Sequence, residues 1–255
     1  MAVDLSVNLN KIALLRNSRE GEFPNLLEFG RRCLSLGASG LTVHPRPDQR
    51  HIRSGDILPL AALLKEYPGR EFNIEGNPFA SAQGSYPGFL NLVMEARPHQ
   101  CTLVPDGNDQ LTSDHGFDLR KDGEKLSPIL KQLRQKNIRT SLFMDPDPAQ
   151  IALAKNIGAD RIELYTGPYA WAVTNNDPHL DAIVDRYYQA AKYAGEIGLG
   201  VNAGHDLNLA NLPRFVNAPY LLEVSIGHAL TVDALSIGWD KAITSYLDIC
   251  QSVNP

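Results

Sequence analysis

Residues 41–76 read LTVHPRPDQRHIRSGDILPLAALLKEYPGREFNIEG. The stretch begins and ends with short apolar segments, 41–45 and 71–76, of the length and composition of buried strands. Between them, residues 56–67 carry apolar side chains at helical spacing. A strand, a helix and a second strand in this order are typical of a crossover unit, in which the two strands run parallel.

The same alternation continues along the whole chain. Strands are predicted at 3–10, 41–45, 71–76, 100–105, 139–145, 161–167, 200–206 and 222–230, and helices at 25–37, 56–67, 87–97, 126–137, 148–158 and 180–198. Such a run of strand–helix units predicts one (β/α)₈ barrel, an α/β fold, as a single domain over residues 1–255. The alternative is a doubly wound open sheet, but no GxGxxG follows the first strand.

Composition narrows the class of protein. The chain is 43% hydrophobic and has 24 Lys and Arg against 29 Asp and Glu, a net charge of −5. The chain lacks the excess of basic residues that a nucleic-acid partner would require. No apolar run is long enough to predict a membrane span. The N-terminal residues lack a signal-peptide pattern, and three scattered cysteines without CxxC spacing indicate reduced thiols. We therefore expect a cytoplasmic protein.

Polar residues alternate with apolar ones in the first three strands. Ser6, Asn8 and Asn10 alternate with Val7 and Leu9, and the second and third strands show the same pattern. Successive strand residues point to opposite faces, so the apolar set should face the helices and the polar set the barrel interior. The polar residues at the C-terminal ends then lie where barrel enzymes have their active sites.

The second strand ends in His44, followed by Arg46, Arg50 and His51. A neutral imidazole beside guanidinium groups suits proton transfer near a bound anion. The alternative is a solvated basic loop, but the strand-end position disfavours it.

The third strand carries Glu75 after an apolar run, so we expect partial burial, a raised pKa and a role in acid–base chemistry. The alternative is a carboxylate paired with an arginine. We expect that structural role for Glu163 and Glu223, which lie mid-strand.

Two further strand ends, NAGHD and SIGHAL, contain His205 and His228 next to glycines that would allow close backbone approach to a phosphate. Arginines at two places, Arg16 and Arg19 after the first strand and Arg46 and Arg50 after the second, suggest two anions. The pocket should therefore take two phosphorylated small molecules. No HExxH or similar ligand spacing predicts a metal site.

Several segments resemble the pyridoxine 5′-phosphate synthase family in the family's order. They are VNLNKIALLRNSR, GLTVHPRPDQRHI, FNIEG, PHQCTLVPD with LTSDHGFD, TSLFMD, IELYTGPYA, VNAGHDL and VSIGHAL, and they span about residues 4 to 230. The run HxRxDxRHI, together with NAGH and IGHA, is highly specific for this family.

The resemblance implies a barrel with extra helices, assembled as a homo-octamer, that needs no metal or other cofactor. It implies condensation of 3-amino-2-oxopropyl phosphate with 1-deoxy-D-xylulose 5-phosphate to pyridoxine 5′-phosphate, phosphate and water. Matched by position, the acid–base residues are His44, Glu75 and His205. The matched contacts to the amino ketone phosphate are Asn8, Arg19, Gly227 and His228, and those to deoxyxylulose phosphate are Arg46, His51 and Thr112.

The sequence departs from the best-known members at two places. Asn10-Lys11 stands where they have Asp-His, and Asp206 stands where they have Gly. All three residues should adjoin substrate, and Lys11 could replace the histidine as a donor to deoxyxylulose phosphate. Two alternatives stay open: another phosphosugar barrel, such as an isomerase or a Schiff-base aldolase using Lys11, and a non-catalytic phosphometabolite-binding barrel.

Overall fold

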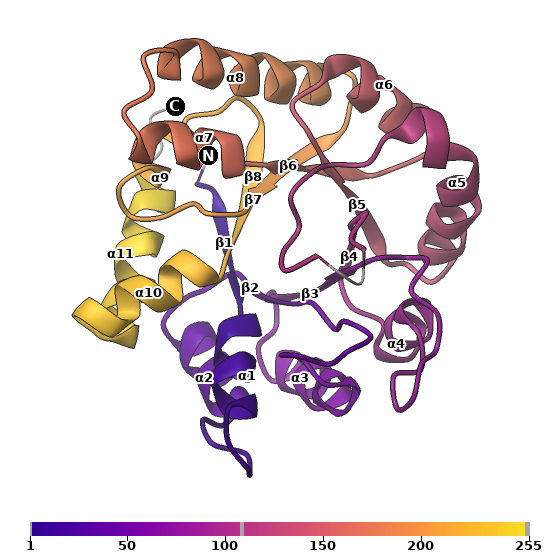
Figure 1. Ribbon diagram of the computed structural model, residues 1–255, viewed down its shortest axis with the longest axis vertical. Coiled ribbons are helices and arrows are strands. Elements are labelled where there is room, and N and C mark those ends of the chain that lie inside the picture. Colours follow the sequence, from indigo (N-terminus) through magenta and orange to yellow (C-terminus); the bar gives the residue numbers. More distant parts are fainter. Residues whose placement is uncertain (1, 108–109, 253–255) are drawn as a thin grey trace.

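The computed structural model describes residues 2–107 and 110–252. Its eight strands form a closed parallel barrel in sequence order, which confirms the predicted fold (Figure 1). The strands are β1 (Asp4–Asn8), β2 (Gly40–Val43), β3 (Glu71–Gly76), β4 (Gln100–Leu103), β5 (Arg139–Met144), β6 (Arg161–Tyr165), β7 (Gly200–Gly204) and β8 (Leu221–Ile226).

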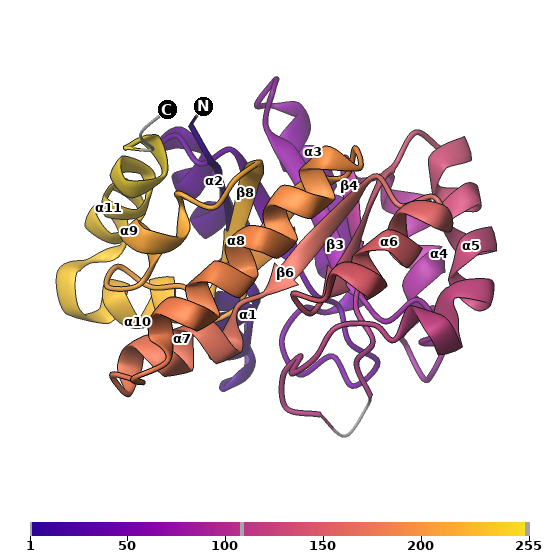
Figure 2. The same cartoon turned by 90° about the horizontal axis from the view of Figure 1, so that it is seen from above.

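Helices surround the barrel. They are α1 (Asn10–Asn17), α2 (Leu26–Ser35), α3 (Ile57–Lys65), α4 (Phe89–Ala96), α5 (Leu119–Gln135), α6 (Pro148–Asn156), α7 (Gly167–Thr174), α8 (Leu180–Glu196), α9 (Leu212–Phe215), α10 (His228–Ile237) and α11 (Trp239–Gln251), with a 3₁₀ turn, η1 (Ser54–Asp56), before α3. Figure 2 shows α9, α10 and α11 together on one side of the barrel and α4, α5 and α6 on the other.

All six predicted helices are present, although α5 starts at Leu119 rather than at 126. The helices that sequence periodicity did not predict are α1, α7, α9, α10 and α11. In α10 only Leu230 is buried, so this helix lacks the apolar stripe that a periodicity argument requires. In α7 apolar residues lie all around the helix, which also removes the periodic signal.

The predicted inward polarity is confirmed between β1 and β4. The hydroxyls of Ser6 and Thr42 are 2.7 Å apart, Asn73 donates to Thr42 at 3.3 Å, and Thr102 donates to Asn73 at 3.1 Å. These bonds join polar side chains of neighbouring strands across the interior. The alternating residues, such as Val7, are fully buried among the hydrophobic core residues between strands and helices.

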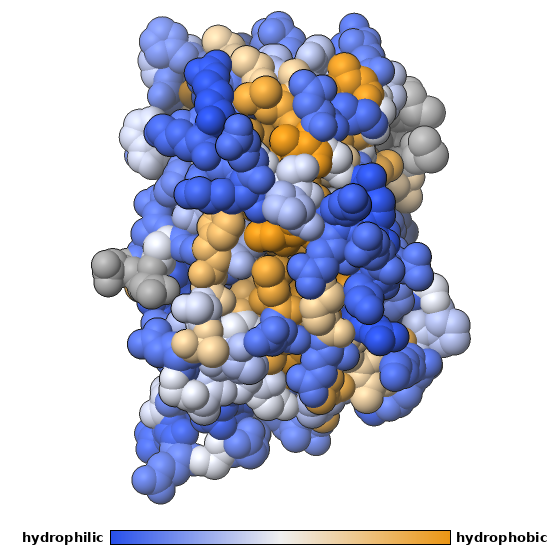
Figure 3. Space-filling view, turned by 90° about the vertical axis from the view of Figure 1, so that its right-hand side faces the viewer, coloured by the Kyte–Doolittle hydropathy of each residue, from blue (hydrophilic) through white to orange (hydrophobic). Residues whose placement is uncertain are grey.

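The outer face beside α4, α5 and α6 is mainly hydrophilic (Figure 3). On the face beside α4, α5 and α6, hydrophilic side chains flank a band of apolar ones (Figure 3). None of the helices within residues 2–107 and 110–252 combines the length and hydropathy needed to cross a membrane.

Candidate active site at the C-terminal end of the barrel

Residues from the ends of β1, β2 and β3 meet in one cluster. The Nδ2 of Asn8 donates to Oε1 of Glu75 at 3.0 Å, and Nδ1 of His44 lies 3.7 Å from the same oxygen. The Glu75 side chain is 13% exposed and that of His44 is 6% exposed. Because neighbouring parallel strands end at the same edge, residues far apart in sequence reach one oxygen atom.

Asn10 does not lie in β1, as the alternating pattern predicted, but begins α1. Its backbone N–H donates to Oδ1 of Asn8 at 2.9 Å, and its own Oδ1 accepts from the backbone N–H of His44 at 2.9 Å. Asn8 provides a side-chain acceptor at the helix start, which ends the strand early. Asn10 therefore holds the end of β2 beside β1 and fixes the backbone of His44.

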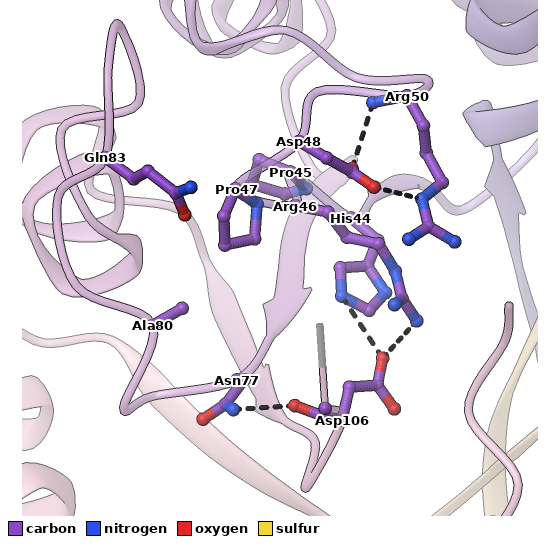
Figure 4. Close-up of a pocket in the computed structure, with 11 residues that line it drawn as sticks. His44, Pro45, Arg46, Pro47, Asp48, Arg50, Asn77, Ala80, Gln83 and Asp106 are labelled. Carbon is purple, nitrogen blue, oxygen red and sulfur yellow. Dashed lines mark hydrogen bonds and ion pairs between the residues drawn. The ribbon is translucent and has the colours of Figure 1, made fainter. Parts of the chain in front are cut away.

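A pocket opens beside this cluster, between the segments that follow β2, β3 and β4 (Figure 4). Asp106 lines this pocket, and its carboxylate forms an ion pair with Arg46 and lies 3.5 Å from Nε2 of His44. His44 and Arg46 thus project to the same side. The His51 ring lies 6.1 Å from that of His44.

The environment of the cluster shifts the pKa values of its carboxyl and its imidazoles in opposite directions. Burial, and then the negative charge of Asp106, raises the pKa of Glu75 from 4.5 to about 7. This confirms the predicted direction. Burial, followed by the positive charges of Arg46 and His51, lowers the pKa of His44 well below 6.5. Burial and Arg46 also lower the pKa of His51 to about 3. A carboxyl with a pKa near neutrality beside a neutral imidazole suits general acid–base catalysis.

His205 stands on the opposite side of the barrel mouth, after β7. Its Nε2 lies 2.8 Å from the hydroxyl of Thr112, and its Nδ1 lies 3.0 Å from Oδ2 of Asp206. The edge of its ring contacts Tyr165, with ring centroids 5.2 Å apart. Its φ of 90° is unusual for a residue with a side chain, and such backbone strain occurs often at functional sites. The hydrogen bond from His205 lowers the pKa of Asp206, so this departure from the family pattern gives the imidazole a charged partner.

The glycines near β7 and β8 make room for other side chains. A Cβ on Gly227 would lie 2.8 Å from the Cβ of Asn8, and one on Gly204 would lie 2.5 Å from Oε1 of Glu163. Gly227 therefore lets β8 approach β1 closely, directly before α10, which begins at the exposed His228.

Two of the arginines after β1 lie away from this cluster. Arg16 is 2% exposed, binds Asp56 through both terminal nitrogens and donates to the carbonyl of His51 at 3.2 Å. The prediction that it binds an anion is wrong, because Asp56 already occupies its guanidinium. Arg19 is exposed beyond the end of α1, and its side chain forms no hydrogen bond or ion pair within the described residues. Lys11, the second residue of α1, contributes its charge to the surroundings of both His51 and Asp206, which places it at the mouth.

The two mid-strand glutamates differ from each other. Glu223 pairs with Arg161 at 3.2 Å, as predicted. For Glu163 the predicted arginine partner is wrong: within the described part of the chain its side-chain contact is the hydroxyl of Thr102 at 3.5 Å. Burial, followed by the charge of Glu75, raises the pKa of Glu163 well above 4.5. Glu163 thus lies close enough to Glu75 for the two carboxyls to influence each other.

Sequence reasoning missed Asp106. It follows β4 by three residues, and the strand-end position that singled out His44 and Glu75 could have identified it. Among residues 2–107 and 110–252, no three His, Cys, Asp or Glu side chains are grouped so that they could hold a metal ion.

Comparison with solved structures shows a common fold. The chain resembles a thiamine phosphate pyrophosphorylase from Pyrococcus furiosus with a TM-score of 0.59 and 12% identity, covering 100% of this chain and 98% of the other. It resembles tryptophan synthase from Mycobacterium tuberculosis with a TM-score of 0.63 and 11% identity, covering 98% and 93%. At these identities the likeness concerns the barrel alone.

Comparison of sequences is far more specific. The chain is 53% identical over 253 residues to the pyridoxine 5′-phosphate synthase of Xanthomonas axonopodis pv. citri (strain 306), covering 99% of this chain and 98% of the relative. It is 51% identical over 252 residues to the enzyme of that name from Xylella fastidiosa (strain 9a5c), covering 98% and 96%. Residues 5–252 match the family described as pyridoxal phosphate biosynthesis protein PdxJ, and the chain belongs to this family.

Proposed function

We propose that this protein is a pyridoxine 5′-phosphate synthase. It condenses 3-amino-2-oxopropyl phosphate with 1-deoxy-D-xylulose 5-phosphate and releases phosphate and water. Family membership supports the reaction. The observation that supports this reaction for the present chain is the pair formed by Glu75 and His44 in the barrel mouth. The pKa of Glu75 is raised to about 7, and that of His44 is lowered, so its imidazole is neutral. Imine formation, loss of phosphate and ring closure all move protons, and such a pair can give or accept them near neutral pH.

Three acid–base groups serve the two sides of the mouth. Glu75 and His44 act from the β2–β3 side, where one carboxylate oxygen faces both Asn8 and the imidazole. His205 acts from the β7 side, where Asp206 would accept from Nδ1–H and so favour the tautomer whose Nε2 carries no proton and accepts from the hydroxyl of Thr112. Groups on opposite sides allow protons to be added to one atom of the forming ring and removed from another.

Two phosphate sites hold the substrates. For the amino ketone phosphate we assign Asn8, Gly227 and His228, at the N-terminal end of α10, where free backbone N–H groups and the helix dipole favour an anion. Arg19 belongs to this assignment by sequence position alone. For deoxyxylulose phosphate we assign Arg46, His51, Thr112 and Lys11, with Asn10 and Asp206 adjoining. Holding both partners converts a bimolecular step into a nearly unimolecular one.

The test is to mix the purified protein with both substrates and to follow pyridoxine phosphate by absorbance together with released phosphate. We expect pyridoxine phosphate and phosphate to form in equal amounts. We expect the protein to form them at the same rate after exhaustive chelation of metal ions. A binding barrel without catalytic activity would bind each substrate but form no product. In a Schiff-base aldolase, borohydride would reduce the imine between the substrate and Lys11 and leave the substrate covalently attached to this lysine. Either result would overturn the proposal.

By family resemblance we further propose a cytoplasmic homo-octamer. Sedimentation of the purified protein should give about eight times the mass of the 28.0 kDa chain. A monomer or dimer at micromolar concentration would contradict this part of the proposal without affecting the reaction.

A further inference from the structure

Asp106 is a buried carboxylate surrounded by the groups that face the deoxyxylulose phosphate side of the pocket. Its side chain is 5% exposed. Its Oδ2 accepts from Arg46 and, at 3.0 Å, from the hydroxyl of Ser113, and it lies 3.5 Å from Nε2 of His44. Its backbone carbonyl accepts from Nδ2 of Asn77 at 2.7 Å. Figure 4 shows the imidazole and the guanidinium converging on this one carboxylate.

The burial of a carboxylate against Arg46, which is assigned to bind a phosphate, requires an explanation. Burying a charge is costly unless it is paired, and a carboxylate on Arg46 also competes with any phosphate that the arginine is to bind. If Arg46 served only as an anion ligand, an unpaired guanidinium at the pocket wall would do better. The observed contacts instead fix the direction of two groups from the β2 segment, because each is held by an atom of the β4 segment.

Resting on the proposed function, we propose that Asp106 is a positioning residue of the reaction. Its carboxylate holds the guanidinium of Arg46 towards substrate and the imidazole of His44 towards Glu75. The His44 ring lies between two carboxylates, 3.7 Å from Glu75 through Nδ1 and 3.5 Å from Asp106 through Nε2. Its rotation is thereby restricted from both ends.

The charge of Asp106 also reaches Glu75. After burial, the negative charge of Asp106 is the largest influence that raises the pKa of Glu75. His205, Asn8 and Arg46 favour the charged form of Glu75. Its carboxyl also faces the imidazole of His44 and the buried carboxyl of Glu163. Burial raises the pKa of Asp106 itself, and Arg46, Ser113, Asp114 and His115 also act on it. Removing the charge of Asp106 should therefore lower the pKa of Glu75.

The experiment compares Asp106→Asn and Asp106→Glu with Asp114→Asn as a control. Asp114 is an exposed carboxylate of the same segment, so its variant removes the same charge without touching Arg46 or His44. For each variant, kcat and KM for both substrates are measured from pH 5 to 9, and folding is checked by thermal melting. Asp106→Ser keeps a hydrogen-bonding oxygen and replaces the amide variant if that variant does not fold.

We expect Asp106→Asn to lower kcat by about 10- to 100-fold, the scale of a misplaced catalytic group. The acidic limb of its pH–rate profile should move to lower pH, since Glu75 then ionises more readily. KM for the amino ketone phosphate should stay within about twofold of wild type. Asp106→Glu should keep the acidic limb of the pH–rate profile at its wild-type position. The Asp114 variant removes a charge near Asp106 but keeps the contacts of Asp106 with Arg46 and His44, so its kcat and KM should stay within about twofold of wild type.

An unmoved acidic limb in a folded Asp106→Asn variant would overturn the inference, since a purely structural role lowers activity without moving it. So would an equal rise in KM for both substrates at unchanged kcat. These outcomes differ from failure of the proposed function, in which the wild-type protein itself would form no pyridoxine phosphate.

Discussion

Glu75→Gln should make the protein more stable at alkaline pH while it removes most activity. In the folded state the pKa of Glu75 is raised from 4.5 to about 7. Between these values the folded chain holds a proton that the unfolded chain has lost, so the contribution of this group to stability is present below about pH 4.5. It is lost as the pH rises through 7.

The magnitude follows from the same values. At about 1.4 kcal/mol per pH unit, a rise from 4.5 to about 7 corresponds to about 3 kcal/mol of stability lost at pH 8. Glutamine has nearly the same shape, cannot ionise, and its carbonyl can still accept from Asn8. The variant should therefore gain up to about 3 kcal/mol relative to wild type at pH 8 compared with pH 5. Its kcat should fall about 10²- to 10⁴-fold, because an amide cannot carry protons.

Urea denaturation of both proteins at pH 5 and pH 8 measures the difference. Glu71→Gln is the matched control, since Glu71 begins the same strand, β3, but is paired with Arg139, which lowers its pKa. That variant should lose a similar amount of stability at pH 5 and at pH 8, because its lowered pKa keeps Glu71 ionised at both. It should therefore lack the pH-dependent gain expected of Glu75→Gln. The reasoning is refuted if Glu75→Gln changes stability equally at both pH values, or if it leaves kcat intact.

Three further predictions concern the mouth of the barrel and its support. Lys11→Ala should weaken deoxyxylulose phosphate binding about 10- to 100-fold, the value of one charged hydrogen bond, and spare the amino ketone phosphate; titration calorimetry with each substrate would show otherwise if both affinities match wild type. Asp56→Ala should cost about 3–5 kcal/mol in urea denaturation, because the buried Arg16 then keeps only the exposed Glu22, 3.9 Å away, as a carboxylate partner. A loss under about 1 kcal/mol would contradict the buried pair. The pKa values of His44 and His51 are lowered, so NMR should show both rings neutral at pH 5. Their contribution to the stability of the fold should be lost as the pH falls below about 6.5, where the unfolded chain takes up protons. Titration of either ring near pH 6.5 would refute this.

Strand periodicity predicted most of the site because it carries directional information. Successive strand residues face opposite sides of the sheet, so Glu75, one position after the buried Ile74, must face the barrel interior. Burial then determines the direction of its pKa shift, which needs no knowledge of its neighbours. The helices that escaped prediction lack this regularity: α10 buries only one residue and α7 is apolar all around.

Partners of charged side chains could not be predicted in the same way, because they come from distant parts of the sequence. Arg16 and Arg46 have the same charge, and both follow a strand end, yet each is bound by a carboxylate at least 40 residues away. For Arg16 that carboxylate, Asp56, occupies both terminal nitrogens away from the pocket, so the pair is structural. For Arg46 it is Asp106, which also faces His44 at the pocket wall, so the pair belongs to the site. An arginine in a sequence therefore indicates an anion site only once its carboxylate partner, and what else that partner touches, is known.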